Sequence, residues 1–139
     1  MSDPLDPNHR VTGVQWRNKF GYAFAGIRDS FLTQASFWVH LPAAVVVIAL
    51  AAFLQLESWR WAVLILCIAI VIAAELFNTA MEQVVVVLHP VRDPRIARAL
   101  DAAAASVLVV AVASVAVGLI VLGPPLLEWL GVLGNDGDL

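Results

Sequence analysis

The sequence predicts an all-helical membrane protein in which an amphipathic surface helix precedes three transmembrane helices. Hydrophobic residues make up 61% of the 139 residues, well above the usual share in a water-soluble domain. Long apolar stretches recur, separated by short polar segments. A chain of this length supports one compact unit. We divide it into a flexible N-terminus (1–13), a membrane domain (14–123) and a short external C-terminal tail (124–139).

Residues 14–33 have the pattern of an amphipathic helix. Large apolar side chains recur there at steps of three and four residues, the spacing of one helix face: Trp16, Phe20, Phe24, Ile27 and Phe31. Basic residues stand mostly on the other faces. Such a helix can lie in the lipid headgroup region. It can equally pack on the bundle of its own chain, and both interpretations stay open.

Three apolar stretches predict the spans. The first covers 41–56 and is extended by 37–40 through the interface, which brings it to about the length that a bilayer needs. The second starts at Trp61 and stays helical to about Leu88. The third covers 101–122, where the sequence Gly123-Pro124-Pro125 is expected to end it.

The basic residues predict the orientation in the membrane. Four of them precede the first span and three lie between the second and third spans: Arg10, Arg17, Lys19, Arg28, Arg92, Arg95 and Arg98. Only Arg60 falls on the other side. Because cytoplasmic segments carry the excess of Lys and Arg, we expect a cytoplasmic N-terminus and an external C-terminus.

The most informative stretch is 75–82, at the end of the apolar run of the second span. Helical geometry places Asn78 about 60° and Glu82 about 20° around the axis from Glu75, so the three side chains form one stripe. Carboxylates in a membrane span are costly and therefore indicate a functional site. The stripe could hold a divalent cation while the amide bonds a phosphate. Alternatively, polar side chains only join helices to one another.

Depth places the stripe near the cytoplasmic boundary. If the second span enters the hydrocarbon at Trp61, about twenty helical residues cross it, so Glu75 lies just inside the boundary and Glu82 close to it. Asp101, at the start of the third span, is expected to return to the same level. Such a site could meet a phosphate-bearing, Mg²⁺-bound substrate from the cytoplasm and a lipid headgroup from the bilayer.

The stretch 75–82 resembles the signature of the prokaryotic integral-membrane diacylglycerol kinase and undecaprenol kinase family, which has Glu, Asn and Glu at these relative positions. The resemblance extends over about 17–122 and includes Gly21-Tyr22, Gly26-Ile27-Arg28 and Asp101. It implies a homotrimer in the bacterial inner membrane that uses MgATP to phosphorylate a lipid hydroxyl, of diacylglycerol or undecaprenol type, at the cytoplasmic face.

The matching residues imply roles. Glu82 would hold Mg²⁺, Asn78 would contact the nucleotide phosphate, and Glu75 would be the base acting on the lipid hydroxyl. Asp101 would support the site from the third span. Tyr22 and Gly26 would lie towards the nucleotide.

Three positions depart from the family pattern. Gln34 stands where a metal-binding Glu is usual, Val86 where the signature ends in Asp, and Leu100 where a Lys precedes the Asp. A carboxamide oxygen can still bind Mg²⁺, so Gln34 remains a metal candidate. Arg98, three residues before Asp101, could supply the missing positive charge.

Two further interpretations come from other classes of protein. The chain could be a non-catalytic relative that binds lipid or nucleotide, or a small ion pathway built on Glu75 and Glu82. The second is disfavoured because the outer half of that span has no polar residue. His40 could contact a lipid headgroup, but an interfacial histidine without a role is the preferred interpretation. His89 is interpreted as a helix-end residue.

Overall fold

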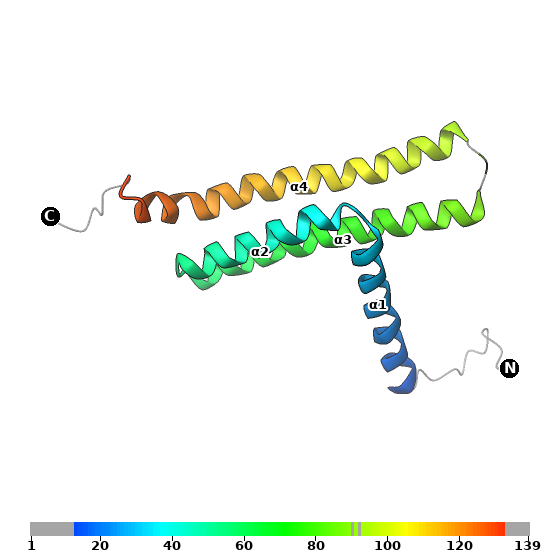
Figure 1. The fold of residues 1–139 in the computed structure, drawn as a ribbon, viewed down its shortest axis with the longest axis horizontal. Coiled ribbons are helices and arrows are strands. Elements are labelled where there is room, and N and C mark those ends of the chain that lie inside the picture. Colours follow the sequence, from blue (N-terminus) through cyan, green and yellow to red (C-terminus); the bar gives the residue numbers. More distant parts are fainter. Residues whose placement is uncertain (1–12, 90, 92, 133–139) are drawn as a thin grey trace. The chain divides into compact units, whose positions relative to one another are not determined.

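The computed structural model describes residues 13–89, 91 and 93–132, and in this part of the chain it contains four helices and no strand (Figure 1). The helices are α1 (Gly13–Thr33), α2 (Phe37–Phe53), α3 (Ser58–Leu88) and α4 (Pro94–Trp129). The prediction of an all-helical chain is confirmed. The expected flexible N-terminus lies almost wholly outside the described residues, as do Arg92 and the last part of the tail.

Helix α1 belongs to a unit of its own, residues 1–33. The helix predicted over 14–33 is confirmed. The side chains of Trp16, Phe20, Tyr22 and Phe24 are exposed, and Trp16 lies at a tilt to Phe20 with the ring centroids 6.3 Å apart. The ammonium group of Lys19 lies 5.0 Å from the centre of the Trp16 ring, a cation–π contact. An exposed aromatic face with a cation beside it suits the expected position among lipid headgroups.

The second unit, residues 34–139, contains α2, α3 and α4. Helices α3 and α4 run antiparallel beside each other, and α2 lies along the first half of α3 (Figure 1). Both α3, with 31 residues, and α4, with 36, are long and apolar enough to cross a membrane. Helix α2, which carries the predicted first span, is as apolar but has 17 residues, so that span stays a prediction.

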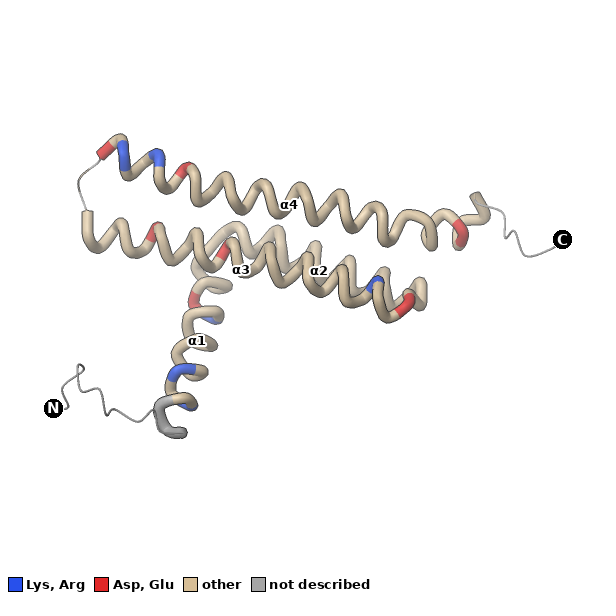
Figure 2. Tube along the Cα trace, turned by 180° about the vertical axis from the view of Figure 1, so that it is seen from behind, with Lys and Arg blue, Asp and Glu red and all other residues tan. Residues whose placement is uncertain are grey.

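Most charged residues of this unit lie near the ends of its helices, and Glu75, in the middle of α3, is an exception. The arginines of α4, Arg95 and Arg98, lie where the chain has just come from α3, and the middle of both long helices carries few charges (Figure 2). At that end Asp93 caps α4 by accepting the backbone N–H of Arg95 at 2.7 Å, with Pro94 in the first turn. The Arg95 side chain and then its backbone N–H stabilise the charged carboxylate, which lowers the pKa of Asp93.

The prediction that Gly123-Pro124-Pro125 ends the third helix is wrong, because α4 continues to Trp129. A proline at position 125 has no N–H to give to the carbonyl of Val121, four residues earlier. Arg60 replaces that donor: its guanidinium Nη1 donates to the Val121 oxygen. The extra turn also packs on α2, where the rings of Phe53 and Trp129 meet edge to face at 5.2 Å.

We expect Arg60→Ala to lower the free energy of unfolding by about 1–3 kcal/mol, the cost of leaving a buried carbonyl without a donor. In a Pro125→Ala background, residue 125 regains its N–H, so the same Arg60→Ala change should cost clearly less. Unfolding of the four proteins in mixed detergent micelles measures this double-mutant cycle. An equal loss of unfolding free energy in both backgrounds would show that Arg60 does not stabilise the protein through the Val121 carbonyl.

The core of the second unit is small and lies at the end where α2 turns into α3. Its buried residues are Ala51, Leu64, Val121 and Leu122. The turn itself needs Gln55 at φ +51°, in the left-handed region. Most other large apolar side chains are exposed in the single chain. Such a surface is suited to contact with lipid or with further apolar helices.

Candidate functional site

The polar stripe of α3 lines a hollow of about 420 Å³ at the level where α2 begins. Glu75, Asn78 and Glu82 face it from α3, and Gln34 faces it from the segment just before α2. Helix α4 contributes only small and apolar side chains to the wall, Ala104, Val107, Leu108 and Ala111. The stripe and Gln34, which the sequence analysis named separately, therefore share one site.

Glu75 is the most enclosed charged residue of this hollow, with 4% of its surface exposed. Both of its carboxylate oxygens have a partner at the start of α2. Ser36 Oγ donates to Oε2 at 2.8 Å, and His40 Nε2 lies 3.1 Å from Oε1. A buried carboxylate is tolerated when its oxygens are hydrogen-bonded in this way.

Asn78 and Glu82 form the second polar pair of the hollow. Asn78 Nδ2 donates to Glu82 Oε1 at 2.9 Å, one helical turn along α3. The other end of the carboxamide, Oδ1, is buried and has no hydrogen-bond partner among the described residues. An unpaired buried acceptor is costly, so this oxygen is available to a ligand that brings a donor or a cation.

The donor set of the hollow fits magnesium. The part of the chain that the structure describes has no cluster of three or more His, Cys, Asp or Glu residues able to enclose a metal. However, Mg²⁺ binds through one or two carboxylates and takes its other ligands from water and substrate phosphates. Glu82, Gln34 and the unpaired Asn78 Oδ1 supply oxygen atoms of this kind.

The expected convergence of Asp101 with the stripe is not seen within one chain. Helix α4 begins already at Pro94, and at the level of the stripe it presents Ala104 and Val107 instead. Asp101 and Arg98 are both exposed on α4 and do not line this hollow. Their roles remain predictions.

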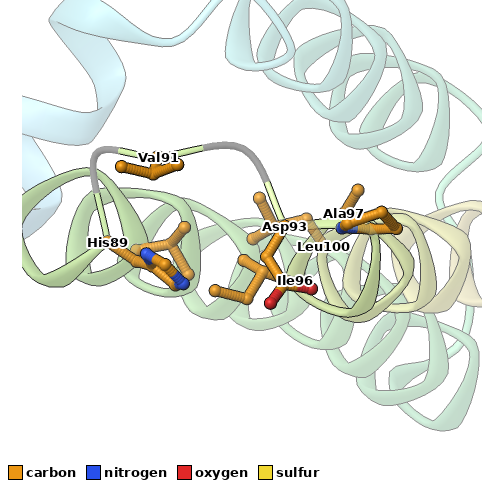
Figure 3. A pocket seen from close by; sticks show the side chains of 8 residues that line it. His89, Val91, Asp93, Ile96, Ala97 and Leu100 are labelled. Atoms are coloured by element: carbon orange, nitrogen blue, oxygen red, sulfur yellow. The ribbon is translucent and has the colours of Figure 1, made fainter.

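The other predicted positions lie elsewhere in the chain. Leu100 lines a separate hollow of about 450 Å³ at the connection between α3 and α4, together with His89 and Asp93 (Figure 3). Tyr22 and Gly26 are exposed on α1, in the first unit, and Gly26 has open space where a side chain would be. Val86 is exposed on α3.

An apolar groove adjoins the polar hollow. It has a volume of about 500 Å³ and is lined by α2, α3 and α4, from Val39 to Leu126. Two residues, His40 and Ala111, line both the groove and the polar hollow. The two spaces therefore meet at His40, and together they could hold a molecule with an apolar body and a polar end.

Sequence reasoning missed Ser36 and His40. Their partner Glu75 is more than thirty residues away, so helix periodicity could not reveal the contact. The available signal was their spacing, since residues four apart share one helix face at the start of the first apolar span.

Two helices of this chain are long and apolar enough to cross a membrane, and an acidic hollow opens beside an apolar groove. These features define a membrane protein whose site suits amphiphilic molecules. The family model of prokaryotic diacylglycerol kinase matches residues 21–122. The chain belongs to this family.

Two curated relatives are similar over most of the chain. A diacylglycerol kinase of Synechocystis sp. is 43% identical over 128 residues, which cover 91% of this chain and 73% of the relative. An undecaprenol kinase of Bacillus subtilis is 32% identical over 119 residues, which cover 86% of this chain and 97% of the relative. Membership of the family makes this chain a lipid kinase, an enzyme that transfers a phosphoryl group to an alcohol.

Proposed function

We propose that this lipid kinase transfers the γ-phosphate of MgATP to the hydroxyl of a membrane lipid at the cytoplasmic boundary of the bilayer. The observation that carries the proposal is the buried carboxylate of Glu75, in a polar hollow that meets an apolar groove. The groove suits the chains of a lipid, and the hollow suits its hydroxyl group and a phosphate.

The proposed reaction gives a task to four polar side chains of the hollow, Glu75, Asn78, Glu82 and Gln34. The lipid oxygen forms a bond to the γ-phosphorus, the bond from that phosphorus to the bridging oxygen breaks, and ADP leaves. Glu75 receives the proton of the hydroxyl. Asn78 orients a nucleotide phosphate, while Glu82 and Gln34 hold Mg²⁺. When bound, the cation offsets the charge of the phosphates.

Residues outside the hollow keep their expected roles as part of the proposal. The family has a lysine where this chain has Leu100, and Arg98 would supply the positive charge for the phosphates instead. Asp101 would support the site. Tyr22 and Gly26 would contact the nucleotide. Because Arg98 and Asp101 do not reach the hollow of their own chain, they fit an assembly in which they serve the hollow of another copy. This supports an oligomer, and we propose a homotrimer because the family resemblance implies three copies.

An assay with γ-³²P-ATP over a panel of lipid alcohols, in lipid–detergent micelles, tests the function. Diacylglycerol and undecaprenol head the panel, because the two relatives carry those substrates in their names. We expect labelled lipid with at least one of them, dependent on added Mg²⁺. No labelled lipid with any alcohol would favour a non-catalytic relative that binds lipid or nucleotide, which the apolar Leu100 already makes the second candidate.

The proposed orientation has its own test. Basic residues flank the first span on its N-terminal side and precede the third, so the N-terminus is expected in the cytoplasm and Leu139 outside. Alkaline phosphatase, which is active only outside the cytoplasm, should give signal when fused after Leu139 and none when fused at Ser2. The reverse pattern would overturn the orientation.

A further inference from the structure

The partners of Glu75 all come from one place, the start of α2. Ser36 and His40 are four residues apart and face α3 together, one on each carboxylate oxygen at 2.8 and 3.1 Å. Two contacts to two different oxygens fix the rotation of the carboxylate as well as its position. A single hydrogen bond would leave that rotation free.

The charge of Glu75 has no cationic partner on its own helix. The sequence from 61 to 88 contains no Lys or Arg, and Asn78 and Glu82 are paired with each other. An ionised carboxylate in an apolar span is costly without such support. An ionised carboxylate can only accept hydrogen bonds, so with Glu75 ionised the His40 nitrogen that faces it is the donor of the contact.

His40 also stands between the two spaces of the site. It lines both the apolar groove and the polar hollow, whereas Glu75 lines only the hollow. The imidazole is partly exposed, with 23% of its side chain accessible. A lipid hydroxyl that comes along the groove would therefore pass His40 before it reaches Glu75.

We propose that Ser36 and His40 position Glu75: they hold its carboxylate ionised and in one orientation for the acceptor hydroxyl, and His40 does not itself take the proton. This inference rests on the proposed kinase function and adds to it two residues, neither of them part of the polar stripe. Besides His40, the titratable groups that line the two spaces are Glu75, Glu82 and Cys67.

Kinetics of two His40 variants test this assignment. His40→Ala should lower kcat by about 10- to 100-fold, the effect of losing a hydrogen bond to a charged group, with KM for ATP and lipid within about twofold of wild type. His40→Gln can donate an N–H but cannot take up a proton at neutral pH, so it should recover most of the loss with an unchanged pH profile. His89→Ala, at the exposed end of α3, is the matched control and should leave kcat unchanged.

Three kinetic results would overturn the positioning role. One is a His40→Ala protein with full activity. Another is a His40→Gln protein as slow as His40→Ala and lacking one limb of the pH profile, which would make His40 itself the proton acceptor. If His40→Ala fails to assemble in detergent, Ser36→Ala takes its place with an expected loss of about fivefold, and full activity there overturns the role.

A second readout does not depend on kinase activity. Dicyclohexylcarbodiimide reacts with protonated carboxyl groups in apolar surroundings, and removal of hydrogen-bond donors favours protonation of Glu75. Labelling of Glu75, measured by mass spectrometry, should be several-fold faster in a Ser36→Ala/His40→Ala protein than in wild type or His89→Ala. If the wild type phosphorylates no lipid, the kinase proposal fails by itself. Equal labelling rates then overturn the positioning of Glu75, and faster labelling supports it.

Discussion

Replacing Glu82 with glutamine is expected to lower kcat by about a thousandfold or more, while the protein stays folded. The change removes one negative ligand from the side of the hollow where Mg²⁺ and phosphates are proposed to bind, and such electrostatic contacts act mainly on the transition state. The fold should survive because a glutamine oxygen can still accept the hydrogen bond from Asn78 Nδ2.

The measurement is phosphate transfer from ATP to the best lipid alcohol at saturating Mg²⁺. Glu128→Gln, an exposed carboxylate in the last turn of α4, is the matched control and should keep wild-type activity. A Glu82→Gln protein within tenfold of the wild-type rate would remove Glu82 from the proposed metal site.

Replacing Glu75 with glutamine is the second substitution for which we expect a large fall in kcat. A carboxamide cannot take the proton of the lipid hydroxyl, so kcat should fall by about a hundred- to ten-thousandfold, the usual worth of a general base. The amide has the shape of the carboxylate, and its oxygen can still accept the bond from Ser36 Oγ. The loss should therefore appear in kcat and not in the amount of assembled protein.

Size-exclusion chromatography in detergent checks the assembly of this variant, and transfer to lipid gives its rate. Thr79, the other buried polar residue of this part of α3, provides the control. Thr79→Val keeps the size of the side chain and should change the rate much less than Glu75→Gln. Near-normal transfer by Glu75→Gln would exclude Glu75 as the base.

The sequence predicted those features that depend on one helix at a time. The spacing of Glu75, Asn78 and Glu82 follows from helix geometry alone, and the structure places all three in one hollow. The helical character of all four segments likewise follows from local periodicity and length.

Features that depend on contacts between helices were not predictable in this way. Considered locally, proline at 125 indicates a helix end. The helix continues because the guanidinium of Arg60, from another helix, donates to the carbonyl that the proline leaves without a donor. The pairing of His40 with Glu75 and the register that brings Ala104 to the hollow in place of Asp101 are of the same kind. They are set by packing, for which a single sequence carries no direct signal.

Helix α3 contributes to the apolar core cluster near its start and carries the polar site in its second half. Leu64 belongs to the core near the turn from α2, whereas Glu75 and Glu82 lie about three and five turns further along. Substitutions early in α3 therefore act mainly on how much protein accumulates in the membrane, and substitutions late in α3 act mainly on how fast each molecule turns over. We therefore expect substitutions near Leu64 to change the abundance of the protein, and substitutions near Glu75 and Glu82 to change its turnover, largely independently of one another.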